Sequence, residues 1–428
     1  MSVMLKKNWL FVGISLLTSV LCFVFSAEGQ EVTLLLNSHF VKDHESELIR
    51  QAEEWAASEG VKVRIDFISD VDLETKITSE AQAGAGHDIV ALRDFVAYIY
   101  RDILTDVTQI VTEIESENGS TLELAKLCSL VDNRWLAIPW YHQSFPIVYR
   151  KDYIEAVGYS IEDMGNLTTD AFLELAKKLA DIGHPVGFPI SMCPDSNASL
   201  APFLWAFGGS LFGKDGTVVV SSSGTAKALD YVHQLSRYMP PEVIGWDNAG
   251  NNLFILSGAG ALTANPPSIY AVALQQNPDL AQELYHAPFP KGPNGRYRCT
   301  GAWSFGIPHY ARNKELASKL IKYLMRKDNF RSLVEASKGY NQPLYEGYQM
   351  FTIWQEVPSL RAYEPVVETL LPIGWPGLEA LPTKAAVRAQ LLYIMPVMFA
   401  KVVAGEETVD GAMRWAEAEL NRLVAEGE

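Results

Sequence analysis

The chain has 428 residues, of which 48% are apolar and 20% charged, and 51 acidic against 35 basic side chains give a formal net charge of −16. This length exceeds the usual size of one hydrophobic core, so we expect two domains, and the apolar fraction excludes a disordered chain. The acidity argues against nucleic acid or an anionic membrane as a partner, because no basic excess exists to neutralise phosphates. Four cysteines are too few for a disulfide scaffold.

The first 29 residues have the features of a secretory signal peptide. Lys6 and Lys7 precede an apolar run over residues 9–25, and small residues follow at positions 26, 27 and 29. We expect a Sec-type signal peptide, cleaved after Ser26 or after Gly29, and therefore a periplasmic mature protein. The alternative is a membrane anchor, which the length of the run disfavours because a bilayer span needs roughly 20 residues.

Three cysteines remain after such a cleavage: Cys128, Cys193 and Cys299. An odd number leaves two possibilities open. One disulfide forms, for which Cys193 with Cys299 is the candidate pair, or all three are buried free thiols.

The segment after the signal peptide alternates apolar runs with helical patterns. Strands are expected over 32–36, 61–67 and 89–92, with helices over 45–57 and 71–83 between them. This order predicts a parallel sheet with right-handed crossovers, in which ligands bind outside the carboxyl ends of the strands. The residues at those ends are Asn37, Ser38 and His39 after the first strand, and Arg93 and Asp94 around the end of the third.

A second α/β block is expected over residues 152–289. Thr169 and Ser223 are candidate caps for two amphipathic helices, and short strands are expected over 186–190, 218–220 and 261–264. Further helices are expected over 314–325 and 409–424. Two α/β lobes leave a cleft between them, and ligands preferentially bind at such domain interfaces.

Sequence motifs of catalysis and of metal or cofactor binding are absent. The chain has no Gly-x-Ser-x-Gly elbow, no His-Glu-x-x-His zinc helix, no Cys-x-x-Cys pair and no Gly-Lys-Ser/Thr phosphate loop. His39, Asp43 and His44 lack a clear further ligand to complete a metal site. Paired carboxylates can hydrolyse glycosides, but no local spacing identifies such a pair. We therefore expect no metal, no cofactor and no catalytic residue.

Aromatic residues carry more information: the chain has 10 Trp, 18 Tyr and 18 Phe, many of them beside Gly, Pro, Asn or Gln. Aromatic rings stack on the C–H face of a sugar or polyol, while neighbouring amides and charged groups pair with its hydroxyls. The alternative for any single tryptophan is that it fills the core. Segments with this character lie around Trp140, Trp205, Trp303, Tyr340 and Trp375.

At these segments the sequence resembles the extracellular solute-binding proteins of family 1, the sugar-type binding proteins of ABC importers. The likeness covers essentially the whole mature chain, from about Val32 to the final helix, and residues 136–141 and 147–158 resemble the family's crossing into the second lobe. Residues 254–265 resemble its strand with a ligand-facing loop, and residues 301–308 resemble its return crossing. The resemblance implies a type II periplasmic binding protein, an α/β fold of two lobes with a hinge and an interlobe cleft.

The resemblance also implies binding positions and boundaries. The positions it implies are Asn37, Ser38, Trp140, Tyr141, His142, Gln143, Asn265, Trp303 and Tyr340. Asn265-Pro266-Pro267 replaces the more usual Gly-Pro-aromatic run and removes a stacking ring, which Trp205 or Trp375 would supply instead. Lobe 1 is expected over 30–150 and about 307–375, and lobe 2 over 151–306 and about 376–428, with hinges near 149–151 and 305–307.

The implied function is capture of a small polar solute, a sugar or a polyol, by a monomer that delivers it to the membrane permease of an ABC importer. Two alternatives remain open. One is a secreted carbohydrate-active enzyme, and the other is a membrane-tethered module or a binding protein that serves a sensory receptor.

Overall fold

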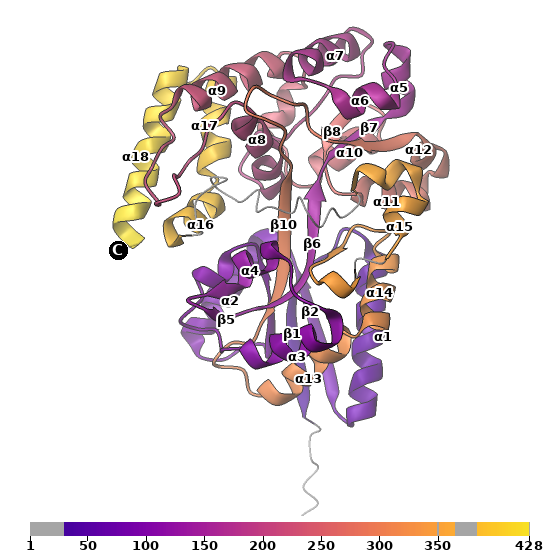
Figure 1. Ribbon diagram of the computed structural model, residues 1–428, viewed down its shortest axis with the longest axis vertical. Helices are drawn as coiled ribbons and strands as arrows, with labels where there is room; N and C mark the ends of the chain where they lie inside the picture. The colour runs from indigo at the N-terminus through magenta and orange to yellow at the C-terminus, as the bar shows by residue number, and fades with distance from the viewer. Residues whose placement is uncertain (1–29, 349–350, 364–382, 428) are drawn as a thin grey trace, which may run out of the picture.

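The computed structural model describes residues 30–348, 351–363 and 383–427. The expected signal peptide and Trp375 lie outside this part of the chain. Within it, the chain forms two α/β lobes, each built on its own sheet, and two long strands extend between them (Figure 1). This architecture confirms the predicted fold class.

The first lobe is built on a six-stranded sheet. Its strands are β1 (Glu31–Asn37), β2 (Lys62–Ile68), β3 (Ile89–Arg93), β6 (Ile138–Phe145), β10 (Cys299–Gly306) and β11 (Gln342–Pro343). They lie in the order β11-β6-β10-β3-β1-β2. β1 pairs in parallel with β2 and β3, as the strand-helix alternation predicts, whereas β10 runs antiparallel to both β3 and β6. The carboxyl ends of β1, β2 and β3 therefore share one edge.

Helices cover this sheet on both sides. They are α1 (Lys42–Glu59), α2 (Asp70–Ala83), α3 (Thr108–Asn118), α4 (Glu123–Ser129), α13 (Lys314–Leu324) and α14 (Lys327–Ala336), with short helices η1 (Val96–Tyr98) and η3 (Glu346–Tyr348) and a hairpin of β4 (Leu130–Val131) and β5 (Arg134–Trp135). α1 buries Leu48, Ala52 and Trp55 on one stripe, which is the helical spacing that packs a helix on a sheet.

The second lobe has a smaller sheet in the order β8-β7-β9. Its strands are β7 (Ile147–Arg150), β8 (Leu262–Ala264) and β9 (Leu284–Ala287), and both neighbours run antiparallel to β7. The helices from the middle of the chain are α5 (Lys151–Ala156), α6 (Ile161–Asn166), α7 (Thr169–Asp181), α8 (Pro194–Ala206), α9 (Ser223–Ser236), η2 (Pro241–Gly245), α10 (Gly250–Leu256), α11 (Ser268–Gln276) and α12 (Pro278–Glu283).

The last elements pack mainly on the second lobe. They are α15 (Ile353–Glu356), η4 (Pro358–Tyr363), α16 (Lys384–Leu391), α17 (Ile394–Val403) and α18 (Val409–Gly427). η4 contacts β9, and α17 packs on α8 and α9. In Figure 1, α16 lies between the two lobes, beside the long strands. α16 contacts η1 of the first lobe as well as α17 and α18.

Strand pairing differs from the expected lobe boundaries at residues 150 and 306. β7 pairs only with strands of the second sheet, so the first crossing lies between Phe145 and Ile147. β10 pairs only with strands of the first sheet, so the return crossing precedes Cys299. β10 is buried along its whole length and β7 at three of its four residues, so neither shows an alternation from which its partners could be read.

Two helix caps lie one residue earlier than expected. Thr168, not Thr169, accepts the backbone N–H of Ala171 at the start of α7, and Ser222, not Ser223, accepts that of Thr225 at the start of α9. Thr168 and Thr169 have the same side chain, as do Ser222 and Ser223, so the side chain alone does not decide which residue caps the helix. In each case the cap is the residue with extended backbone, because its hydroxyl oxygen reaches the third N–H of the helix. Of the three short strands expected here, only β8 forms. Residues 186–190 and 218–220 contribute isolated bridges at Val186 and Val218.

The three cysteines of the described chain, Cys128, Cys193 and Cys299, are buried and free, so the candidate pairing of Cys193 with Cys299 is wrong and the alternative of free thiols is confirmed. In the described residues, no single helix is long and apolar enough to cross a membrane. α16 and α17 pass that test only together, and they meet at 45°.

Candidate functional site

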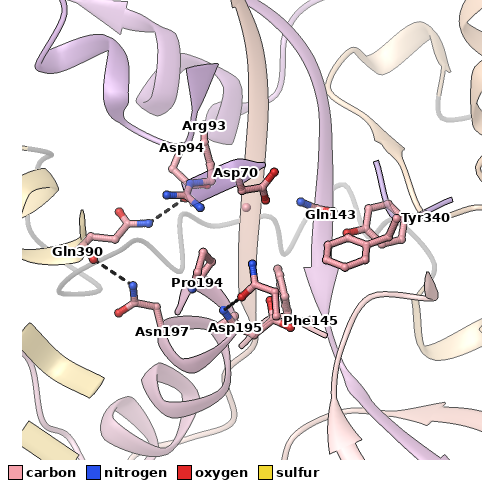
Figure 2. Close-up of a pocket in the computed structure, with 14 residues that line it drawn as sticks. Asp70, Arg93, Asp94, Gln143, Phe145, Pro194, Asp195, Asn197, Tyr340 and Gln390 are labelled. Atoms are coloured by element: carbon pink, nitrogen blue, oxygen red, sulfur yellow. Dashed lines mark hydrogen bonds between the residues drawn. The ribbon is translucent and has the colours of Figure 1, made fainter. Parts of the chain in front are cut away.

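A small cavity lies between the two lobes, where the carboxyl end of β3 faces the start of α8 (Figure 2). Its volume is about 40 Å³. The first lobe contributes Phe40, Asp70, Arg93, Asp94, Gln143, Phe145, Gly301 and Tyr340, and the other side is lined by Pro194, Asp195, Asn197, Ala198, Asn248 and Gln390. The lining combines charged groups, amides and aromatic rings from both lobes.

Asp94 is fixed by backbone and amide donors. Its φ of 49° lies in the left-handed region, which aspartate tolerates better than most residues. Its Oδ1 accepts the Ala302 N–H at 3.0 Å, and its Oδ2 accepts from Nε2 of Gln390 at 2.8 Å. Burial raises the pKa of Asp94, although Arg93 and these donors oppose the shift. Asp94 is therefore a structural acceptor that ties α16 to the first lobe.

Arg93 ends β3 and brings one positive charge to the cavity. Its Nη2 donates to Oε1 of Glu74 at 3.3 Å, while the buried Nη1 has no hydrogen-bond partner in the described chain. Burial alone lowers the pKa of Arg93, but the carboxylates of Glu74, Asp94 and Asp70 hold it above its usual value. The guanidinium thus stays charged and keeps one donor group for a ligand.

Two further carboxylates, Asp70 and Asp195, come from opposite lobes. Asp70 is the first residue of α2, directly after Ser69 at the end of β2. Asp195 follows Pro194 at the start of α8, and its Oδ2 accepts from Nδ2 of Asn251 at 2.9 Å. Burial raises the pKa of Asp70 to about 6 and that of Asp195 to about 7, and the charge of Asp70 adds to the second shift.

Gln143 and Tyr340 lie on the opposite side of the cavity from Gln390 (Figure 2). Gln143 is on β6 and only 9% exposed, and its Oε1 has no hydrogen-bond partner in the described chain. Tyr340 follows α14 and its ring meets that of His39 edge-on, with centroids 4.8 Å apart. The amide offers a free acceptor, and the ring offers an apolar face for a ligand's C–H groups.

A wider groove adjoins the cavity, and we call it the outer groove. Phe40 and Asn248 line both spaces, and the outer groove has a volume of about 610 Å³. Its apolar lining includes Phe40 and Val71 of the first lobe and Met192, Ile244 and Trp246 of the second. Its opening between the lobes gives the small inner cavity an apolar entrance.

Four of the predicted site residues line the cavity: Arg93, Asp94, Gln143 and Tyr340. Trp375 lies outside the described residues. The other nine do not line it: Asn37, Ser38, His39, Trp140, Tyr141, His142, Trp205, Asn265 and Trp303. Among these, Asn37, Ser38 and His39 do follow β1 as expected, but it is Phe40, the next residue, that reaches the cavity.

Three of the tryptophans predicted to bind the ligand are packed in the core. Trp140, Trp205 and Trp303 are each at most 2% exposed. The Trp140 ring stacks on Phe305 with centroids 4.3 Å apart, and Trp303 lies in β10 between β3 and β6. Asn265 is also buried, where its Nδ2 donates to Ser268 Oγ at 3.0 Å. In these positions the rings stabilise the lobes and do not face the cavity.

Several lining residues were missed by the sequence analysis: Phe40, Asp70, Phe145, Pro194, Asp195, Asn197, Ala198, Asn248, Gly301 and Gln390. Asp70 could have been predicted from the sequence. It follows the carboxyl end of β2, which lies beside that of β1, and ligands bind outside the carboxyl ends of parallel strands. Asp195 and Asn197 sit in the first turn of a helix that begins with proline, a recognisable start. Nothing in the sequence around Gln390 predicts that it lines the cavity.

Two histidines beside the cavity pack against each other. His39 and His44 stack with centroids 4.2 Å apart, and burial lowers the pKa of His39 to about 4. Nε2 of His39 bonds Asn341 Oδ1 at 3.1 Å. In the described chain, no group of three or more His, Cys, Asp or Glu side chains is arranged to hold a metal ion.

Similar solved structures share this fold over almost their whole length. The maltose-bound MalE3 of T. maritima is 23% identical, with a TM-score of 0.78 over 92% of this chain and 99% of that one. A solute-binding protein of Thermotoga lettingae bound to alpha-D-tagatose is 19% identical, with a TM-score of 0.79 over the same shares. One of Agrobacterium radiobacter in complex with ribitol is 19% identical, with a TM-score of 0.74 and again the same shares.

Relatives found by sequence are distant. A probable ABC transporter-binding protein of Deinococcus radiodurans is 24% identical over 53% of this chain and 56% of its own length, so the match spans about half of that relative. The erythritol/L-threitol-binding protein of Mycolicibacterium smegmatis is 22% identical over 84% of this chain and 79% of its own.

The family model of the bacterial extracellular solute-binding proteins matches residues 42–329, which is more than half of the chain. The match spans both lobes and both crossings. It begins in α1 and ends in α14. Family membership implies an exported protein that binds a solute. The chain belongs to the family of bacterial extracellular solute-binding proteins.

Proposed function

We propose that this protein is the periplasmic solute receptor of an ABC importer, and that it binds a sugar or a polyol in the cavity between its lobes. The observation that carries the proposal is the lining itself. Asp70, Arg93 and Gln143 face Asp195 across a space between two lobes, and Arg93 and Gln143 each keep a buried polar atom without a partner in the described chain. Buried polar groups left in this state gain most from a polar ligand.

Binding couples to lobe closure because the ligand contacts both lobes at once. Only the closed arrangement makes all of these contacts, so a bound solute shifts the equilibrium toward it. The cavity of about 40 Å³ is smaller than the roughly 300 Å³ of the smallest common ligand pockets, so the lobes lie further apart than in this structure when a solute is bound. The closed monomer would then deliver the solute to the permease.

The names of related proteins support a small hydroxylated solute. Similar structures hold maltose, alpha-D-tagatose and ribitol, and one relative is named for erythritol and L-threitol. We expect the residues that line the inner cavity to contact a single short unit once the lobes lie further apart. The outer groove, with Trp246 and Phe40, offers apolar surface for a second ring of a longer ligand. On this proposal the solute leaves unchanged, and Asp70 and Asp195 bind hydroxyls without hydrolysing a bond.

A calorimetric screen tests the proposal. Protein from residue 30 onward is titrated with monosaccharides, disaccharides and polyols, and each solute is analysed afterwards by mass spectrometry. We expect one solute class to bind with one site per chain and to be recovered intact. The Gln143→Leu variant serves as the control for the site. Absence of binding to every solute, or recovery of a hydrolysed glycoside, would contradict the proposal.

A further inference from the structure

The inner cavity holds more negative than positive charge. Asp70, Asp94 and Asp195 line it, and Arg93 is the one cationic side chain among the described residues that do so. That guanidinium is already paired with Glu74 at 3.3 Å. Carboxylates that are removed from water without a counter-charge destabilise the closed arrangement, so the lining lacks a positive partner.

The three carboxylates differ in how their oxygens are used. Both oxygens of Asp94 accept hydrogen bonds, from Ala302 and Gln390. Asp195 receives one, from Asn251 to its Oδ2, and its Oδ1 has no partner in the described chain. Asp70 accepts no hydrogen bond from the residues described. Asp70 and Asp195 therefore keep free acceptor capacity on the two sides of the cavity.

A further free acceptor lies in the same space. Oε1 of Gln143 is buried on a side chain that is only 9% exposed, and it has no partner in the described chain. Asp70, Asp195 and Gln143 thus each keep a free acceptor, and the two carboxylates add negative charge that the lining does not balance, because its guanidinium is already paired with Glu74. An ammonium group has three donors, no acceptor and one positive charge, which is the complement of this lining.

We propose that the solute bound in the inner cavity carries a protonated amine in addition to hydroxyl groups, with the amine between Asp70 of the first lobe and Asp195 of the second. Amino sugars and aminopolyols have this chemistry. The inference rests on the proposed function and names its substrate class. Burial is the main cause of the raised pKa values of Asp70 and Asp195, and neighbouring carboxylates add to both shifts while Arg93 opposes them.

The amine would also contribute to closure. Asp70 and Asp195 belong to different lobes, so closing the empty cleft brings two negative groups together. An ammonium between them replaces that repulsion with two charge-assisted hydrogen bonds. A neutral hydroxyl can donate to one carboxylate but adds no charge. The preference for an amine therefore depends on both aspartates.

Matched solutes test the inference at pH 7 by calorimetry. The pairs are glucose with glucosamine, galactose with galactosamine and sorbitol with its 1-amino-1-deoxy derivative, and N-acetylglucosamine keeps the nitrogen but removes the charge. We expect the protein to bind at least one amine about 10-fold or more tightly than its neutral and acetylated partners. Asp70→Asn and Asp195→Asn should each reduce that preference below about 3-fold, whereas Asp181→Asn, an exposed control on α7, should leave it unchanged.

The outcomes separate the two proposals. If neutral solutes bind as tightly as their amines, or if the preference survives both aspartate variants, the inference is wrong and the proposed function stands. If no neutral and no amino solute binds, the proposed function fails and the inference fails with it. Asp70→Asn keeps the test decisive if Asp195→Asn does not fold, because Asp70 has no hydrogen bond in the described chain to lose.

Discussion

Nε2 of Gln390 on α16 donates to Oδ2 of Asp94, at the end of β3, over 2.8 Å, although 296 residues separate the two along the chain. The backbone oxygen of Gln390 accepts from Nδ2 of Asn197 on α8 at 3.1 Å. One residue thus joins the first lobe to the second through the wall of the cavity (Figure 2). Its two hydrogen bonds connect the lobes in the arrangement that this structure describes.

Gln390→Glu should weaken closure. The substitution places a second carboxylate against that of Asp94 in a buried position, where like charges repel strongly. We expect the affinity for the bound solute to fall about 10-fold or more, and the radius of gyration of the unliganded protein to rise in small-angle scattering.

Gln275→Glu is the matched control. Gln275 donates to Asp43 across the exposed rim at 3.1 Å, where water screens the charge, so affinity should change less than about 2-fold. Equal effects in both variants would refute the role of Gln390.

Asp195→Asn should stabilise the empty protein in a pH-dependent way. Burial raises the pKa of Asp195 to about 7, above its unfolded value, so the folded state binds this proton more tightly than the unfolded state. Ionisation therefore lowers the stability of the native protein as the pH rises from about 4 to 7. The variant does not ionise, and its advantage in unfolding free energy should grow over that window to on the order of 2 to 4 kcal/mol. Denaturant unfolding at several pH values measures this. Asp181→Asn should show no such growth, and an advantage for Asp195→Asn that is constant with pH would contradict the account.

Gln143→Leu should separate binding from stability. Oε1 of Gln143 is buried without a partner in the described chain, so leucine removes no hydrogen bond of the empty protein there. We expect the unfolding free energy to stay within about 1 kcal/mol of the native value and the affinity for the solute to fall about 10-fold. Thermal unfolding and calorimetry check the two parts. A large loss of stability with unchanged affinity would show that Gln143 is structural.

Trp303→Ala should act on the fold. Trp303 is 1% exposed in the centre of the first sheet, and truncation of such a ring costs about 3 to 5 kcal/mol of stability. Denaturant unfolding measures the loss.

Trp246→Ala is the contrasting variant, because Trp246 is half-buried in the outer groove against Phe254, with ring centroids 5.0 Å apart. It should cost less stability and weaken the binding of disaccharides more than that of monosaccharides. A fully stable Trp303→Ala that no longer binds would place that ring in the site after all.

The parallel pairing of β1, β2 and β3 could be predicted from the sequence. Apolar residues recur with a different spacing in strands and in helices, and these strands and helices alternate along the chain. The same reasoning placed Arg93 and Asp94 at a strand end, and both line the cavity. The pairing of β7 and β10 could not be predicted, because strands that are buried on both faces have no alternation that indicates a partner. The hydrogen bonds between strands show that β7 belongs to the second sheet and β10 to the first.

The positions of the tryptophan side chains could not be predicted from the sequence either. Trp140 and Trp303 stand in segments that resemble the family's crossings between the lobes, but in β6 and β10 their side chains are buried in the core. A one-residue change of position on a strand exchanges a buried face for an exposed one, and Gln143 rather than Trp140 reaches the cavity from the same strand. Gln390 was beyond prediction because its contact with Asp94 depends on how the last helices fold back between the lobes.

The most direct test of the central claim is equilibrium binding of the identified solute to the native protein and to a double variant, Asp195→Asn with Gln143→Leu, followed by mass spectrometry of the released solute. The account predicts one solute per native chain, released unchanged, and at least about 100-fold weaker binding by the double variant if two contacts of about 1.4 kcal/mol each are lost. Undiminished binding by a folded double variant would show that the solute binds outside the interlobe cavity. A chemically altered solute would show that the protein is not a simple receptor.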